Sequence, residues 1–520
     1  MKRIFTLIFI VCLVLCLTAC GGGDDQSAAN EAVLYHAYSN APYQTLDPRV
    51  ENGSGVLLMH NVYETLTHYN DQTGEVEPVL ATDWEVSEDG LTWVFHLRDD
   101  VTFHDGTPMT AETVASSILS TQEKGMGAAY IWDPVVSAEA TGDYEVTFTC
   151  SYPAPLDLIA SASLASYILS EEAQGQPSEW FNDGHDGGTG PYMITQATGD
   201  TCVLQAYEDY RGGWNDNQFK NVILKEVPVS NARRQMLETG EAQLTSNLTS
   251  TDEAALREET DKVTVESFDT FTNIFIMLNH ESAPTDNEDF RKALAYAFPY
   301  EENISDVLEG NGAISHGLVA PGLWGHDDNI PAYTCDLEKA QEYLDKSGID
   351  PASVNLRLTY ATGISEYESW AQLYQVNLKK LGIKLELSPM EWDNQWDIGR
   401  ATNPDDRQDL FVFAWWPDYA SPESWFTSMI RSEDEIFYNL GYIKNPEYDA
   451  LIEDAILNTS SDRDKAAQDY IELQQQLFDH ADIMVLYDRV MTYAYSNAID
   501  GVYENPAYGW CVDYYNITMK

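Results

Sequence analysis

The sequence predicts a large α/β protein built from two or three lobes. Its 520 residues exceed what one hydrophobic core usually organises, and 44% hydrophobic with 12% aromatic residues can fill several cores. Strand-like and helix-like patterns are mixed along the chain without a regular βαβ alternation. The aromatic content excludes an acidic disordered chain.

The N-terminus predicts export and a lipid anchor. A basic start is followed by an apolar run that is shorter than the ~20 residues of a bilayer crossing, so residues 1–19 form a signal peptide. The segment LTAC at 17–20 resembles the bacterial lipobox, in which cleavage precedes a cysteine that receives diacylglycerol. Residues 20–30 are then the lipidated Cys20 and a flexible tether. The alternative is a secreted protein whose Cys20 lies at the cleavage site by chance.

The charge balance narrows the class of partner. The chain carries 28 basic and 85 acidic residues, a net charge of −57. Nucleic acid is excluded as a partner because phosphate binding needs clustered lysine and arginine. The field favours a cationic or amine-bearing ligand, although acidity also serves simply to keep an exported protein soluble.

The cysteines do not define a metal or redox site, because no CxxC occurs. Two of the seven leave with the signal peptide and a third is the lipidation site. Those that remain are Cys150, Cys202, Cys335 and Cys511. An exported protein can form disulfides, but the three possible complete pairings and four free thiols all stay open.

Strands and helices alternate irregularly in the first half of the chain. Residues 91–97, 144–150 and 222–227 alternate apolar and polar side chains, as half-buried strands do. Thr110 is placed to cap a helix. A further helix after residue 230 should end at Gly240.

The second half is richer in helices. Asp289 precedes a helix that Pro299 ends, because the residue before a proline avoids the α region. Asp336 caps a helix that stops at Gly348, and residues 369–387 form a helix, a glycine turn and a strand.

One carboxylate stands out by its surroundings. DLFVFAWW at 409–416 is an apolar run typical of a buried strand, and Asp418 lies just past its carboxyl end, where α/β folds often bind ligands. No lysine or arginine occurs within 413–425. A carboxylate among indoles loses solvation and needs a cation or hydrogen-bond donors, and indole faces attract cations as well. The alternative is an Asx-turn in which backbone N–H groups satisfy Asp418.

Motifs along nearly the whole mature chain resemble one family, the family 5 extracellular solute-binding proteins of ABC importers, a group of oligopeptide-, dipeptide- and nickel-binding proteins. Their order and spacing carry the resemblance more than any single motif does. The matching segments are TLDPRV at 45–50, the block at 62–117, GTGPY at 188–192, DFRKALAYA at 289–297, GLVAPG at 317–322, DLEKAQEYL at 336–344 and NPEYDALIEDA at 445–455.

The resemblance implies a two-lobe periplasmic-binding-protein clamshell, type II-like and of the large cluster C, with an additional small α+β domain. The implied division is 31–75 plus 190–270 plus 488–520 for lobe I, 76–189 for the extra domain and 271–487 for lobe II. The chain would cross between lobes near 268–275 and 486–494, which gives a hinge.

The resemblance also implies a function. The protein would be the lipid-anchored substrate-binding subunit of an ABC importer, a monomer without cofactor, metal or enzymatic activity. It would capture peptides or similar amine-bearing solutes between its lobes and deliver them to a permease with its ATPases. It would face the extracellular or periplasmic side of a bacterial cell envelope, and whether that envelope has one membrane or two stays open.

In peptide-binding members, a W-x-x-D segment followed by a proline binds the α-ammonium of the ligand. Residues 415–418 with Pro422 resemble that segment, and Trp392 is similar to a pocket tryptophan of dipeptide-binding relatives, its alternative being core packing. The segment 38–40 resembles the lobe I strand end that pairs with an extended peptide. The expected ligand-binding residues are Asp418, Trp416, Trp415, Trp392, Tyr38, Ser39 and Asn40.

The chain departs from dipeptide-binding relatives at one point. These carry an arginine for the ligand carboxylate in the loop that corresponds to ATGISEYES at 361–369, which here contains no base. The nearest base is Arg357, on a predicted strand. A longer peptide, a blocked peptide or a cationic non-peptide therefore remains open.

Three other functions compete. A metal-chelate binder of the nickel type is suggested by the i, i+4, i+8 spacing of His60, Glu64 and His68, but a strand expected from Leu66 breaks that helix face. A receptor for signalling peptides would use the same cleft. A secreted hydrolase could use an acid pair, yet the chain has no GxSxG, HExxH, Walker or GxGxxG motif.

Overall fold

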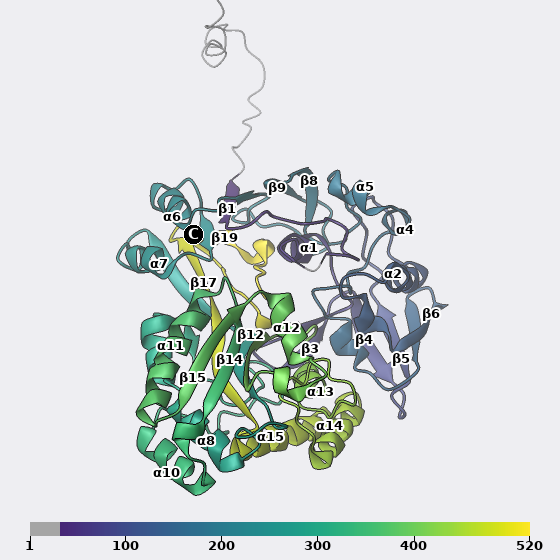
Figure 1. The fold of residues 1–520 in the computed structure, drawn as a ribbon. Helices are drawn as coiled ribbons and strands as arrows, with labels where there is room; N and C mark the ends of the chain where they lie inside the picture. Colours follow the sequence, from purple (N-terminus) through teal and green to yellow (C-terminus); the bar gives the residue numbers. More distant parts are fainter. Residues whose placement is uncertain (1–31, 52) are drawn as a thin grey trace, which may run out of the picture.

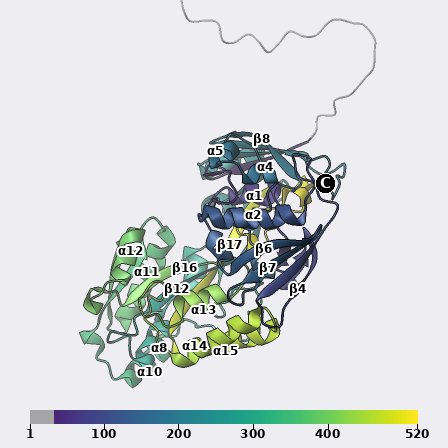
Figure 2. The ribbon, with the colours of Figure 1, turned by 90° about the vertical axis from the view of Figure 1, so that its right-hand side faces the viewer.

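The computed structural model describes residues 32–51 and 53–520. The predicted signal peptide, Cys20 and the whole predicted tether lie outside the described residues. The chain forms two halves joined by a pair of long strands (Figure 1). Figure 2 shows the half with α8, α10 and α11 offset from the half with α1 and β8. The mixed α/β architecture predicted from the sequence is confirmed.

One large sheet runs through both halves. Of the described strands, 11 belong to it, in the order β15-β14-β16-β12-β17-β11-β1-β10-β9-β8, with β13 paired to β17. Their bounds are β1 Val33–Tyr38, β8 Tyr192–Thr198, β9 Thr201–Ala206, β10 Asn221–Glu226, β11 Leu244–Ser246, β12 Val263–Leu278, β13 Gly312–Ala313, β14 Asn355–Ala361, β15 Lys384–Met390, β16 Leu410–Trp415 and β17 Ile483–Ser496.

The antiparallel strands β12 and β17 link the two halves. Toward one end β17 pairs with β11, and toward the other β12 pairs with β16. Between these regions the register of β12 against β17 shifts, between Asp269 and Asn273. Such an irregularity locally interrupts the ladder, and it falls where the sequence led us to expect a hinge, which stays a prediction.

The first half packs one core around its part of the sheet. The helices in it are α1 Val56–Val62, α4 Glu171–Gln174, α5 Ser178–Asn182, α6 Ser230–Thr239 and α7 Ser250–Arg257. As predicted, α6 is followed by Gly240, which has a φ of 81° and closes the helix in the left-handed conformation. Apolar residues of the C-terminal segment, from Ile499 to Ile517, also pack in this core.

A small α+β unit lies beside the first half. Its four-stranded sheet has the order β4-β5-β7-β6 and is covered by α2, which Thr110 caps as predicted. Leu169, Ala173 and Phe181, which the predicted division assigns to this unit, pack instead in the core of the first half. The bounds are β4 Ala81–Val86, β5 Thr92–Leu97, α2 Ala111–Lys124, η1 Ala129–Trp132, β6 Val135–Gly142, β7 Glu145–Cys150 and α3 Leu156–Ile159.

The second half covers its part of the sheet with helices. Their bounds are α8 Glu288–Ala297, α9 Tyr300–Glu302, α10 Leu337–Ser347, α11 Ser365–Lys380, α12 Trp392–Gly399, α13 Glu423–Met429, α14 Pro446–Thr459 and α15 Arg463–His480. Asp336 and Gly348 flank α10, and Phe298 is extended before Pro299, as predicted. Helix α8 begins earlier than Asp289, because Asn287 caps it.

The remaining elements are short. Two hairpins, β2 with β3 and β18 with β19, pair outside the larger sheets. Their bounds are β2 Thr67–Asn70, β3 Glu75–Pro78, β18 Ile499–Asp500 and β19 Thr518–Met519; the short helical turns are η2 Asn303–Val307, η3 Pro351–Ser353, η4 Pro404–Asp406, η5 Pro506–Tyr508 and η6 Tyr514–Asn516. The four cysteines among the described residues are free, three of them buried.

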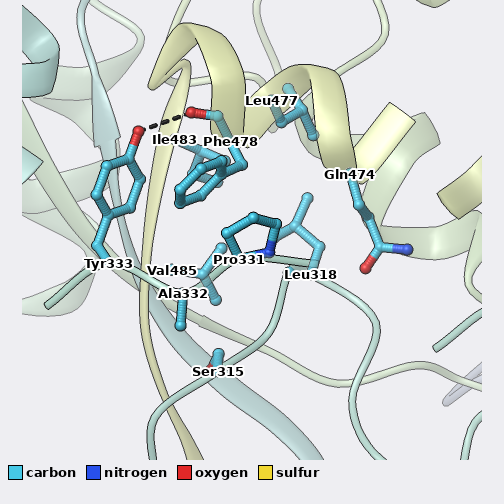
Figure 3. A pocket seen from close by; sticks show the side chains of 11 residues that line it. Ser315, Leu318, Pro331, Ala332, Tyr333, Gln474, Leu477, Phe478, Ile483 and Val485 are labelled. Atoms are coloured by element: carbon cyan, nitrogen blue, oxygen red, sulfur yellow. Dashed lines mark hydrogen bonds between the residues drawn. The ribbon is translucent and has the colours of Figure 1, made fainter. Parts of the chain in front are cut away.

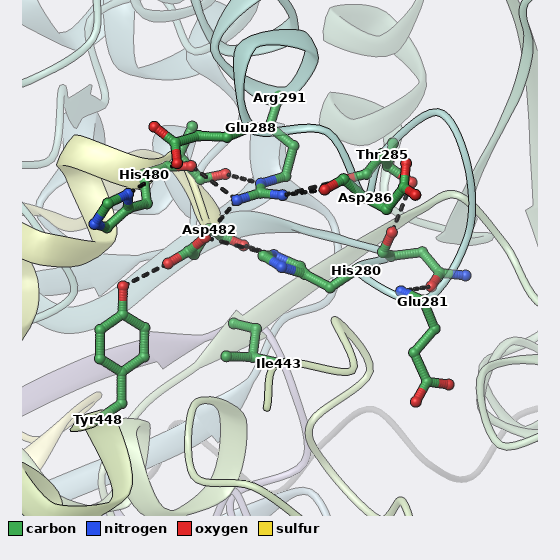
Figure 4. A network of polar contacts seen from close by, with 12 residues as sticks. His280, Glu281, Thr285, Asp286, Glu288, Arg291, Ile443, Tyr448, His480 and Asp482 are labelled. Carbon is green, nitrogen blue, oxygen red and sulfur yellow. Dashed lines mark hydrogen bonds and ion pairs between the residues drawn. The ribbon is translucent and has the colours of Figure 1, made fainter. Parts of the chain in front are cut away.

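A buried polar network fixes α8 to the end of α15 (Figure 4). The Asp482 carboxylate accepts hydrogen bonds from Arg291 Nη2 at 2.7 Å and from the Tyr448 hydroxyl at 2.6 Å. The Asp482 carbonyl oxygen lies 3.0 Å from His280 Nε2. Charge and hydrogen-bonding capacity are thus matched, as a buried ion pair requires.

The core of the second half is closely packed. A cavity of about 20 Å³ lies between β17, α15 and the segment around Pro331, where the Tyr333 hydroxyl donates a hydrogen bond to the Phe478 carbonyl at 2.6 Å (Figure 3). That volume is close to the room one water needs. This cavity therefore belongs to the packing of the fold and is too small for a solute.

Candidate functional site

A pocket of about 720 Å³ opens where β16 ends. It brings together four residues predicted from the sequence as ligand contacts: Asp418, Trp415, Trp416 and Trp392. The other lining residues come from the small α+β unit, from or next to α11, α12, β16 and β17, and from the segment between α13 and α14: Tyr130, Ile364, Tyr367, Asp393, Trp396, Asp397, Arg400, Phe413, Ala414, Tyr438 and Arg489.

The buried strand β16 places Asp418 at the pocket. β16 lies between β14 and β12, and its apolar residues fill the core on both faces. Pro417 cannot donate to a sheet ladder, so the chain turns away directly after Trp416. Trp415 anchors the turn by donating from Nε1 to Ser424 Oγ at 3.1 Å.

Asp418 is partly buried and has little compensation for its charge. Among the described residues it forms no ion pair; its side-chain partner is the Tyr130 hydroxyl, which donates a hydrogen bond from the small unit. Burial raises the pKa of Asp418, and the Tyr130 hydrogen bond opposes that rise. Burial and the neighbouring Asp418 charge raise the pKa of Tyr130 in turn. The site therefore stabilises an added positive charge or donor.

Aromatic rings form the walls around this carboxylate. Trp392, on the first turn of α12, is 46% exposed and packs against Trp396 and Phe413, with ring centroids 5.5 and 5.7 Å away. Trp416 is 50% exposed and faces Trp510 of the C-terminal segment at 6.2 Å. Half-exposed indoles can still cover a ligand, whereas core indoles cannot.

The segment at the end of β1 is placed elsewhere. Tyr38 is 4% exposed and packs in the core of the first half, because strand alternation turns it inward there. Ser39 Oγ accepts a hydrogen bond from Asn247 Nδ2 at 3.4 Å, and Asn40 is exposed. None of the three lines the pocket. Side-chain contact by Tyr38 conflicts with its burial, and backbone pairing with a ligand stays a prediction.

Sequence reasoning did not identify two important lining residues. Tyr130 comes from a separate unit, and nothing in its local sequence connects it with Asp418. Arg489 lies in the predicted crossing segment and forms an ion pair with Glu366. Its signal was the single base of the strand Ile483–Ser496, next to Asp488. Arg357, by contrast, donates to the Asp406 carbonyl and does not line the pocket.

The residues that suggested a metal chelate gather at a different cavity. His60, Glu64 and His68 line a space of about 160 Å³ beside Tyr508. Glu64 is already bound by Arg211, at 2.5 and 2.6 Å. Burial lowers the pKa of both histidines to about 4. Within residues 32–51 and 53–520, no group of three or more His, Cys, Asp or Glu is arranged to hold a metal ion.

The fold and this pocket define a two-lobed binding protein, and comparison with known families agrees. The family described as "Bacterial extracellular solute-binding proteins, family 5 Middle" matches residues 75–435, well over half of the chain. The chain belongs to this family of solute-binding proteins.

Individual relatives support the same assignment. The chain is 29% identical over 475 residues to the "Probable D,D-dipeptide-binding periplasmic protein DdpA" of Escherichia coli (strain K12), which covers 89% of this chain and 90% of the relative. Two solved structures share the fold. NikA from Brucella suis in complex with Fe(III)-EDTA has a TM-score of 0.81 at 21% identity, covering 94% of this chain and all of that chain.

The second structure is DppA from Helicobacter pylori in complex with the peptide STSA. Its TM-score is 0.70 at 23% identity, and the match covers 94% of this chain and 98% of that chain. The two-lobe fold that the sequence motifs implied is thus confirmed. Over residues 32–51 and 53–520, no helix combines the length and the apolar character needed to cross a membrane.

Proposed function

We propose that this protein is the substrate-binding subunit of an ABC importer and that it captures peptides or similar amine-bearing solutes. One observation carries the proposal: Asp418 is a partly buried carboxylate in an aromatic pocket, without a cationic partner among the described residues. Membership of a solute-binding family supports a ligand role for the pocket, and the relative named for D,D-dipeptides supports a peptide.

An α-ammonium group suits Asp418 for a physical reason. It brings both a positive charge and three hydrogen-bond donors, which replace the water that Asp418 loses in the pocket. A hydrogen bond between two charged groups is worth more than one between neutral groups. The indole rings of Trp415 and Trp416, which line the same pocket, add cation–π attraction.

The remaining parts of the proposal rest on the N-terminus and the family. Cys20 is lipidated after removal of residues 1–19, which holds the monomeric protein on the outer side of a bacterial membrane. There it delivers its ligand to a permease and its ATPases. The protein performs no chemistry on the ligand and needs no cofactor.

The test is calorimetric binding of short peptides with and without an N-acetyl group. Asp418→Ala should weaken binding of the free-amine form by more than tenfold, on the order of 1.4 kcal/mol or more. N-acetylation should weaken binding to the wild type similarly and add little to the loss in the variant. Asp393→Asn is a matched control, because Asp393 lines the same pocket but is exposed.

An unchanged affinity of Asp418→Ala would remove the ammonium role. Native mass spectrometry of the purified, unlipidated protein first identifies a suitable peptide. A metal chelate released from the pocket would instead favour the chelate-binding alternative, for which the likeness to NikA with Fe(III)-EDTA is the supporting observation. A signalling-peptide receptor would give the same binding result and differ in the absence of uptake.

A further inference from the structure

We propose that the Arg489–Glu366 ion pair closes the pocket opposite Asp418, and that Arg489 receives the terminal carboxylate of a two- or three-residue peptide while Glu366 is the internal carboxylate it displaces. This inference rests on the proposed function and specifies the length and chemistry of the ligand.

The ion pair separates two cavities. Arg489 lines the pocket that holds Asp418 and also a second cavity of about 340 Å³ on its other side. Glu366 lines the second cavity and is not among the residues of the first. The ion pair therefore lies between the two cavities, and a ligand in the first pocket ends where it meets this pair.

Arg489 has unused capacity to bind a carboxylate. A guanidinium has five N–H donors arranged to grip a carboxylate in a bidentate manner. Among the described residues, Glu366 is the only hydrogen-bond partner of the Arg489 side chain, and that side chain is 36% exposed. A second carboxylate can therefore reach it from the pocket.

Glu366 can release Arg489 without being left unsatisfied. It lies in the first turn of α11, where the helix dipole favours a negative charge. It also accepts a hydrogen bond from the Tyr487 hydroxyl at 3.1 Å. These interactions hold Glu366 when a ligand carboxylate competes for the guanidinium.

The other arginine of the pocket is less available. The Arg400 guanidinium lies over the rings of Trp396 and Phe437, at 4.4 and 4.2 Å from their centroids. Its Nε donates to the Phe437 carbonyl at 2.9 Å. These two ring contacts and this hydrogen bond hold its guanidinium at the wall of the pocket, so Arg489 is the better receiver.

The sheet register gives a scale for the length of the ligand. Asn273 of β12 pairs with Trp415 on one side and with Asp488 on the other. Two strand spacings separate these backbones by about 10 Å. Asp418 follows Trp415 closely, and Arg489 follows Asp488. An extended peptide advances ~3.3–3.6 Å per residue, so two or three residues join the two charged ends.

The test is calorimetry with a peptide panel. Di-, tri- and pentapeptides with free or amidated C-termini are measured on the wild type, Arg489→Met, Glu366→Gln and the control Arg400→Met. We expect the wild type to bind free-acid di- or tripeptides at least tenfold more tightly than their amides, and pentapeptides more weakly. Arg489→Met should abolish the acid preference, and Glu366→Gln should preserve or increase it. Arg400→Met should retain the preference.

Arg489→Met and Glu366→Gln should change the acid preference in different ways. If the ion pair were only structural, breaking it from either side would have the same effect. If both variants weaken acids and amides equally, or if the wild type does not distinguish them, Arg489 does not bind the carboxylate. Tight binding of a pentapeptide would show that the Arg489–Glu366 pair does not limit the length of the ligand.

The two proposals can fail separately. If peptide binding depends on Asp418 but not on Arg489, only this inference fails. If no peptide binds the wild type, the proposed function fails with it. Should Arg489→Met not fold, the amide comparison and Glu366→Gln still decide.

Discussion

Two carboxylates of the second half, the buried Asp482 and the partly buried Asp418, have contrasting surroundings. Asp482 is 6% exposed and is matched by the Arg291 guanidinium and the Tyr448 hydroxyl. Asp418 is also shielded from water, but its described partner is a single phenol, Tyr130. The first arrangement uses its carboxylate to hold helices together. The second leaves electrostatic capacity for a ligand, and this difference distinguishes a structural acid from a binding acid.

The strongest way to break this comparison is to remove the structural acid. Asp482→Ala leaves Arg291 buried without its counter-ion and should destabilise the protein by about 3–5 kcal/mol. Chemical denaturation with calorimetry measures the loss. The control is Glu288→Ala on α8, the helix of Arg291; the partly exposed ion pairs of Glu288 with Lys292 and His480 should contribute less than about 1 kcal/mol. Equal effects of the two changes would show that Asp482 is not structural.

A third carboxylate, Asp488, extends the comparison to the pH dependence of stability. Burial raises the pKa of Asp488, on the crossing strand β17, to about 7, against a smaller opposing effect of the Ser315 hydroxyl at 2.7 Å. Because the folded pKa is the higher one, the contribution of Asp488 to stability is full below about pH 4. It is lost as the pH rises toward 7.

Asp488→Asn should therefore gain stability relative to the wild type over pH 4–7, on the order of 3–4 kcal/mol. The measurement is the free energy of unfolding of both proteins at several pH values across that window. Parallel stability curves would show that Asp488 has the same pKa in the folded and unfolded chains.

The smallest expected effect concerns the stability of the binding acid itself. Asp418→Asn removes a charge that burial disfavours, as the raised pKa shows. At pH 7 the variant should be more stable than the wild type by roughly 0.5–2 kcal/mol while it binds peptide more weakly. Thermal unfolding without ligand tests this. A loss of stability would mean that Asp418 serves the fold, like Asp482.

Local signals in the sequence located several secondary-structure boundaries. Caps such as Thr110 and Asp336 were found because their side-chain oxygens satisfy free N–H groups within the same turn. The start of α11 was missed by several residues. Its first turn, beginning at Ser365, is polar and carries little of the apolar stripe that revealed the rest of the helix.

Some residues of the candidate site were likewise found from local sequence, and others were not. Asp418 and its neighbouring tryptophans were identified from the sequence because a strand, a proline and the absence of bases are local facts. Tyr130 was not, because it reaches Asp418 from a unit almost three hundred residues earlier in the chain. Which face of β1 enters the core was not evident from the sequence either: strand pairing places the Tyr38 side chain in the core, and the expected backbone pairing of residues 38–40 with a peptide stays a prediction.

By itself the sequence determined the α/β character, several helix ends, the family and the carboxylate at the end of β16. These depend on periodicity, capping and motif order, which are properties of neighbouring residues. Only the tertiary structure decided that Arg489 pairs with Glu366, that Tyr130 covers Asp418 and that Asp482 is satisfied. Each of these depends on segments far apart in the chain, and their distances follow from sheet register and packing, which no local pattern encodes.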